Sequence, residues 1–274
     1  GTVRVVTTPD PMAQRENRQG VVMARAQRLW TGGAASLILA PRVRGGSPDA
    51  VFSTEFSATN PEHRALLMAS HQLSDAVNGQ LVVLFESSKA PKLGASATAL
   101  VNDHLVAHAE VSSEREQGLF ASCAADASSA AERRRSRVSA GLTVSLPNRL
   151  SVTVEGEYDG HAPELRAWQD LFARSPARAV GYLQAAQFQQ QLAAKSAWLV
   201  YIAKRGFLAS EIDLSALVRV NAEDNSQIYW AELRRHWEGF DLSLQWQATR
   251  GRVASQFGVL RQKQSLQLVL THFF

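Results

Sequence analysis

Apolar and polar residues alternate along several stretches of the chain. Segment 240–249 alternates without a break, and its apolar positions are Phe240, Leu242, Leu244, Trp246 and Ala248. Segments 212–220, 138–146 and 152–158 show the same period of two. Because successive side chains of a β-strand point to opposite faces, this pattern predicts strands with one apolar and one polar face. Each run has about the 9 to 11 residues that a tilted strand needs to cross a bilayer.

Counting back from the C-terminus, the pattern predicts about fourteen strands, within a range of roughly 12 to 16. The expected strands are 260–274, 240–249, 227–237, 211–221, 197–205, 150–159, 137–146, 104–114, 93–101, 80–88, 64–73, 50–58, 35–43 and 21–30. The predicted fold class is therefore all-β, an antiparallel up-and-down transmembrane β-barrel.

The expected connectors separate by length onto opposite sides of such a barrel. The short ones are Glu238-Gly239, 206–210, Pro147-Asn148, Asn102-Asp103, 75–79 and 45–48. The long ones are 117–135 and 160–196, with shorter loops at 221–226 and 250–256 on the same side. Transmembrane barrels have short turns on one side and longer loops on the other, so this sorting supports the prediction.

One segment departs from the period of two. The spacing of Leu165, Trp168 and Leu171, and the similar spacing after Pro176, predict two amphipathic helices inside a loop insertion at about 161–195. This helical loop is interpreted as a cap on the barrel rim, with a plug in the lumen or a surface that docks a partner as alternatives. Residues 21–274 are assigned to the barrel, and residues 1–20 to an N-terminal extension, a luminal segment or the end of another strand.

Composition is compatible with a strand-built membrane protein. The chain has 274 residues, of which 45% are hydrophobic and 20% charged, and no run reaches the roughly 18 to 20 apolar residues of a transmembrane helix. This excludes helical membrane proteins. A barrel escapes the test because only every second residue of its strands faces lipid.

Charge and cysteine content exclude other classes. The net charge is +4, yet the arginines are scattered apart from the run at 133–135. Since nucleic-acid binding proteins show a basic patch on a recognisable module, no nucleic-acid partner is predicted. Cys123 stands alone, without a CxxC or Cys/His cluster, so no metal and no cofactor are expected.

The C-terminal strand carries a more specific signal. Its alternating positions end on Leu270, His272 and the terminal Phe274. This resembles the terminal signature of bacterial outer-membrane β-barrels of porin-like type, although His272 stands where that family usually has a large hydrophobic residue. The resemblance implies an outer-membrane location, a lipid bilayer and lipopolysaccharide as surroundings, recognition of these terminal residues by the barrel-assembly machinery, and an extracellular position for the helical loop. It identifies no subfamily and no catalytic residues.

The polar face of the strands is predicted to line the lumen. Its ionisable residues have both signs, which indicates either a water-filled channel or an interior of ion pairs and argues against strong ion selectivity. The predicted residues are Arg25, Glu86, His104, His108, Glu110, Arg137, Glu155, Glu157, Asp213, Arg219, Glu232, Arg234 and Asp241. Aromatic residues near strand ends, such as Trp237 and Phe240, are candidates for girdles at the membrane interfaces, whereas Trp230 shares its face with Glu232.

No catalytic residues are predicted. His104 and His108 lie about 13 Å apart on a strand, at roughly 3.3 Å per residue, which is too far for a shared metal. No nucleophile elbow or phosphate-binding glycine loop is present.

Three functions remain open from the sequence. A channel for small solutes comes first. The second is a structural barrel that holds a lipoprotein, cytochrome, polysaccharide or secretion partner, at the helical loop or in the lumen. The third is an outer-membrane hydrolase.

Overall fold

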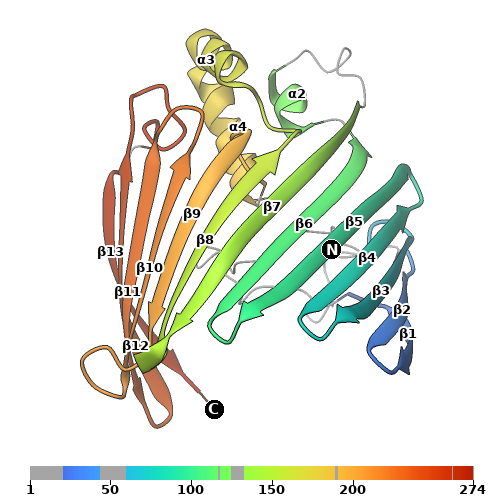
Figure 1. Ribbon diagram of the computed structural model, residues 1–274. Coiled ribbons are helices and arrows are strands. Elements are labelled where there is room, and N and C mark those ends of the chain that lie inside the picture. Colours follow the sequence, from blue (N-terminus) through green and yellow to red (C-terminus); the bar gives the residue numbers. More distant parts are fainter. Residues whose placement is uncertain are drawn as a thin grey trace, which may run out of the picture. The chain divides into compact units, whose positions relative to one another are not determined.

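The computed structural model describes residues 21–43, 60–116, 118–124, 133–188, 191–260 and 262–273. Within these residues, thirteen antiparallel strands follow one another in chain order, each hydrogen-bonded to its neighbours in sequence (Figure 1). The strands are β1 (Ala24–Trp30), β2 (Gly33–Ala40), β3 (Arg64–Ser74), β4 (Val77–Glu86), β5 (Lys89–Asn102), β6 (Leu105–Glu116), β7 (Arg133–Leu146), β8 (Leu150–Asp159), β9 (Ser196–Lys204), β10 (Ile212–Asn221), β11 (Gln227–Trp237), β12 (Phe240–Arg250) and β13 (Gln264–His272).

The chain divides into two units, which are described separately. The first contains the described residues of 1–99, 108–116 and 132–138, and the second contains those of 100–107, 117–131 and 139–274. The first therefore holds β1 to β4 and parts of β5 to β7, and the second holds β8 to β13 with the helices α2 (Leu119–Ala124), α3 (Leu165–Arg174) and α4 (Pro176–Phe188).

In the first unit the strand register separates an apolar face from a mixed one. One row across β2 to β5 consists of Leu37, Leu67, Val83 and Leu93. The three leucines of this row are exposed. The adjacent row, on the opposite face, ends on Leu84 and Lys92, both of which are buried. Large apolar side chains are thus solvent-accessible on one face while a charged side chain is buried on the other.

The second unit repeats this separation. An apolar row across β10 to β13 consists of Leu214, Leu233, Leu244 and Leu268. The next row, one residue along each strand and on the opposite face, consists of Ser215, Glu232, Gln245 and Gln267. Because the side-chain period of a strand is two, this register keeps apolar and polar residues apart across four strands.

The helices of the second unit form a small core of their own: α3 and α4 lie in the loop between β8 and β9, and α2 follows β6 (Figure 1). Trp168, Leu171 and Tyr182 are buried in it, and the rings of Phe120 and Tyr182 meet edge to face with centroids 5.2 Å apart. Pro176 is the first residue of α4, where a missing N–H costs no hydrogen bond. Burial, followed by the charge of Asp159, raises the pKa of the Tyr182 phenol.

The helical core is tied to the loop between β12 and β13. The indole Nε1 of Trp168 donates a hydrogen bond to the carbonyl oxygen of Ala254 at 2.7 Å. The backbone N–H of Gln256, in the same loop, donates to Oδ2 of Asp224 in the loop between β10 and β11, at 2.7 Å. The long connectors of the second unit are therefore ordered against one another.

In the described residues, every helix falls short of the length and apolar character that a membrane-spanning helix requires.

The predicted fold class is confirmed: the protein is all-β, antiparallel and up-and-down, and its described strands fall within the expected number. The two helices divided at Pro176 are also found. The predicted strand 50–58, the turn 45–48 and the N-terminal segment 1–20 lie outside the described residues.

Several predicted boundaries were wrong; the strand expected from 93, for example, begins at Lys89. The turn expected at 75–79 is only two residues long, and Gly79 lies within β4. A Cβ at Gly79 would lie 3.1 Å from Leu73 Cδ1, so this glycine accommodates a close side chain rather than a turn. The strand expected from 137 begins at Arg133, and the last strand begins at Gln264 rather than at 260.

Candidate functional site

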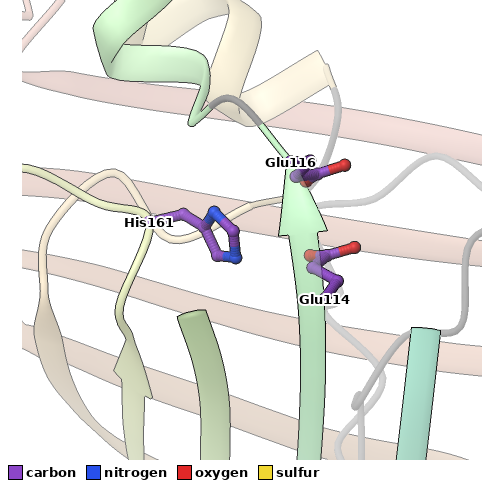
Figure 2. A group of neighbouring side chains, drawn as sticks. All are labelled: Glu114, Glu116 and His161. Atoms are coloured by element: carbon purple, nitrogen blue, oxygen red, sulfur yellow. The ribbon is translucent and has the colours of Figure 1, made fainter. Parts of the chain in front are cut away.

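The charged side chains of the first unit form a connected network, here called the β3–β7 ladder. Its members are Arg64, Glu86, Lys89, Lys92, Glu114, Glu116 and Arg137. Glu114 and Glu116 are two residues apart at the end of β6, and Figure 2 shows both carboxylates extending to the same side of the strand. This is the geometry that an i, i+2 spacing imposes on a strand.

Lys92 is the centre of this ladder. Its Nζ lies 2.7 Å from Glu114 Oε2, 3.4 Å from Glu116 Oε2 and 3.5 Å from Glu86 Oε2. The side chains of Lys92, Glu86 and Glu114 are each only 6% exposed. Charges buried to this extent need partners, and one ammonium group here serves three carboxylates.

The two ends of the β3–β7 ladder add further cations. Arg64 Nε lies 3.5 Å from Glu86 Oε1, and Lys89 Nζ lies 3.6 Å from Glu86 Oε2. Arg137 forms an ion pair with Glu114, and its second nitrogen lies 3.7 Å from Glu116 Oε1. Both carboxylates on β6 are therefore already balanced by basic side chains.

A second network, the β10–β12 ladder, lies near the short turns of the second unit. Its members are Asp213, Glu232, Arg234, His236, Asp241 and the amide of Gln245. His236 is held between two carboxylates, with Nδ1 3.0 Å from Asp241 Oδ1 and Nε2 3.3 Å from Asp213 Oδ2. Arg234 lies 2.9 Å from Glu232 and 3.8 Å from Asp241. The side chains of Arg234 and His236 are each 42% exposed, so this ladder meets solvent.

Between the β10–β12 ladder and the long loops, Glu157 of β8 forms an ion pair with Arg219 of β10. Glu155, two residues earlier on β8, is 2% exposed and shares this face. Trp230 lies on the same face and is buried, as expected from its parity with Glu232.

The remaining predicted residues are distributed over both units. Arg25 of β1 donates to Ser36 Oγ at 3.3 Å, and His108 and Glu110 are half-buried on β6. His104 is not on a strand; it is exposed in the turn before β6, where its backbone N–H donates to Asn102 Oδ1 at 2.9 Å. Leu270 and His272 lie on the apolar face of β13, and Phe274 lies outside the described residues.

The prediction missed five residues of the β3–β7 ladder and two of the β10–β12 ladder, His236 and Gln245. Glu114 and Glu116 have the same parity as Glu110, and His236 has the parity of Glu232, so extending the alternation would have found them. Arg64, Lys89 and Lys92 stand at the starts of their strands, where no apolar alternation precedes them.

Neither unit by itself brings three metal-binding side chains within ligand distance in the described residues. His161, also drawn in Figure 2, belongs to the second unit, where its backbone N–H donates to Asp159 Oδ1 at 2.8 Å.

Comparison with protein-family models finds no match, and comparison with curated protein sequences finds none either. Solved structures do match. A mutant of the Rhodopseudomonas blastica porin is 12% identical with a TM-score of 0.51, covering 90% of this chain and 75% of that one. A triple mutant of the same porin gives 11% and 0.52 over the same shares. Pseudomonas aeruginosa OccK11 (OpdR) is 9% identical with a TM-score of 0.53, covering 90% of this chain and 67% of that one. At such identities the likeness establishes the fold, which is that of the porin β-barrel.

Proposed function

We propose that this chain is an outer-membrane channel of the porin type that passes small solutes. The observation that carries the proposal is the reversed burial in both units: large apolar side chains are exposed on one face of the strands, and charged side chains are buried on the other. A soluble sheet has the opposite arrangement, because water then contacts its polar face.

The apolar face fits a lipid environment. Leu67, Leu81, Leu266, Leu268 and Leu270 are between 45% and 69% exposed. A protein with an apolar surface that continues across neighbouring strands would aggregate in water. In a bilayer, lipid tails contact this surface and water does not. This supports the outer membrane as the location, with lipid and lipopolysaccharide as the surroundings and the barrel-assembly machinery as the partner that inserts the chain.

The polar face fits a water-filled lumen of weak selectivity. The β3–β7 ladder has four basic and three acidic side chains. The β10–β12 ladder has three acidic groups, one arginine and one histidine. Because each ladder pairs both signs at close range, the field that a passing ion meets is partly cancelled, and we expect neutral solutes to pass as well as small ions.

Liposome swelling tests this function. Protein refolded into vesicles that enclose dextran is diluted into isotonic arabinose or into an isotonic sugar too large for a narrow lumen. We expect swelling in arabinose alone. If the protein in the vesicles gives a folded, heat-modifiable band on a gel and the vesicles swell in neither sugar, an open channel is excluded.

A scaffold for a protein partner is the second candidate. It is favoured by the ordered core of α2, α3 and α4, which gives the long-loop side of the second unit a structured surface. Deleting residues 161–195 would then abolish co-purification of a partner from native membranes. For a channel alone, the same deletion would change conductance without removing any bound protein.

A further inference from the structure

One charged residue on the apolar face of the second unit is not explained by the proposed channel. The row that contains Arg235 otherwise consists of Ile212, Leu242 and Leu270. Other basic residues on this face of β8 to β13, Lys204 and Arg250, are the last residues of their strands. Arg235 stands two residues inside the end of β11, where a permanent positive charge among leucines requires an anionic or aromatic partner.

The side chain of Arg235 reaches toward the short turn between β11 and β12. Its Cζ lies 4.5 Å from the centroid of the Trp237 ring. Trp237 is in turn stacked on Phe240, with centroids 4.8 Å apart and an interplanar angle of 14°. A long basic side chain that bends toward the strand end in this way keeps its charge at the edge of the apolar layer, and the aromatic pair marks that edge.

The guanidinium group keeps donors available for a ligand. A guanidinium group that stacks on an aromatic ring contacts the ring with its flat face. Its N–H groups then point outward, in the plane of the guanidinium. Within the described residues no carboxylate lies within the 4.0 Å of an ion pair with Arg235. Glu211, in the loop before β10, feels this charge only at longer range: Arg235 contributes to its lowered pKa after the hydrogen bonds from Ser210 and the backbone.

We propose that Arg235, supported by Trp237 and Phe240, binds the phosphate of a phospholipid headgroup at the short-turn edge of the second unit. A phosphate accepts paired N–H donors from a guanidinium group, and the acyl chains of the same lipid would lie along Leu242 and Leu270. This rests on the proposed function, since a headgroup reaches the site only when the apolar face is covered by a bilayer or by a micelle that contains the lipid.

Native mass spectrometry of the full chain tests the site. The protein is refolded in dodecyl maltoside, a detergent without phosphate, and phosphatidylglycerol is added at increasing concentration. We expect wild type to retain one lipid that R235Q binds about fivefold more weakly, the factor that corresponds to about 1 kcal/mol for one basic residue at a membrane surface. R235K should retain part of this affinity, because an ammonium group binds phosphate as a point charge.

Arg250 provides the matched control. It lies on the same face of β12 at the other strand end, and R250Q should retain the lipid as wild type does. Diacylglycerol with the same chains, and inorganic phosphate, should bind at least fivefold more weakly than phosphatidylglycerol. Equal retention by wild type and R235Q, or equal binding of diacylglycerol and phosphatidylglycerol by wild type, would overturn the site. A chain that does not form a heat-modifiable band in micelles or vesicles would instead overturn the proposed channel.

Discussion

Both ladders pair carboxylates with basic side chains, but the central cation of the β3–β7 ladder is buried and the cations of the β10–β12 ladder are partly exposed. In the β3–β7 ladder, Lys92, Glu86 and Glu114 are each 6% exposed. In the β10–β12 ladder, Arg234 and His236 are each 42% exposed. A buried charge that loses its partner keeps its full desolvation cost, whereas an exposed one recovers hydration. We therefore expect the β3–β7 ladder to determine the stability of the fold and the β10–β12 ladder to influence which ions and solutes pass through the channel.

The largest effect is expected at Lys92. K92M leaves three carboxylates near one another without their shared ammonium group, and the free energy of unfolding should fall by about 3 to 5 kcal/mol. Urea titration of the protein in vesicles, followed by tryptophan fluorescence, measures this change. K89M is the control: the Lys89 side chain is 43% exposed, so its loss should cost less than about 1 kcal/mol. Equal costs for the two variants would show that burial of the cation does not set the cost of losing it, which is the basis of the distinction between the ladders.

A smaller change in stability, with a change in permeation, is expected at Arg234. R234Q removes a cation that contacts Glu232 and Asp241, and the permeability ratio should shift toward cations by about two- to fivefold, since one unit charge is worth about 1 kcal/mol at 4 Å in water. The reversal potential in a salt gradient measures it. An unchanged permeability ratio would place these side chains away from the permeation path.

The helical core offers a prediction that is independent of both ladders. W168F keeps an aromatic ring at this position but loses the indole N–H that bonds Ala254, and the loss of this hydrogen bond should cost about 0.5 to 1.5 kcal/mol. Amide exchange within α3 and α4 should accelerate while exchange in β10 and β11 stays unchanged. Acceleration throughout the second unit would show that the helices and strands unfold together.

The smallest effect concerns Glu211. The Ser210 hydroxyl donates to Glu211 Oε1 at 2.6 Å, and this bond is the main cause of the lowered pKa of Glu211. A carboxyl whose pKa is lower in the folded than in the unfolded protein stabilises the fold at pH above its pKa in the unfolded protein. This contribution is lost as the pH falls through its pKa in the folded protein. S210A should raise the pKa towards the ordinary range of a glutamate, as followed by carbon NMR of the carboxyl. An unchanged titration would assign the shift to the backbone hydrogen bond.

The strands were predictable because each carries its own signal. Leu242 and Ser243 take opposite faces through chain geometry alone. The ladders were only partly predictable, because an ion pair across strands depends on the register between them. Alternation places Glu86 on the polar face, but nothing in the sequence shows that Lys92 of the next strand reaches Glu86 and Glu114 together. Lys92 follows Pro91 at the start of β5, where the pattern of apolar residues has not yet begun.

The central claim is that the chain forms a conducting pore, and single-channel recording in a planar bilayer tests it most directly. The detergent-refolded protein is added to one chamber after a heat-modifiability gel has verified that it is folded. We expect discrete conductance steps with a reversal potential close to zero in a salt gradient, because both ladders pair opposite charges. A folded protein that inserts and produces no steps would contradict the account and leave the scaffold as the function to test.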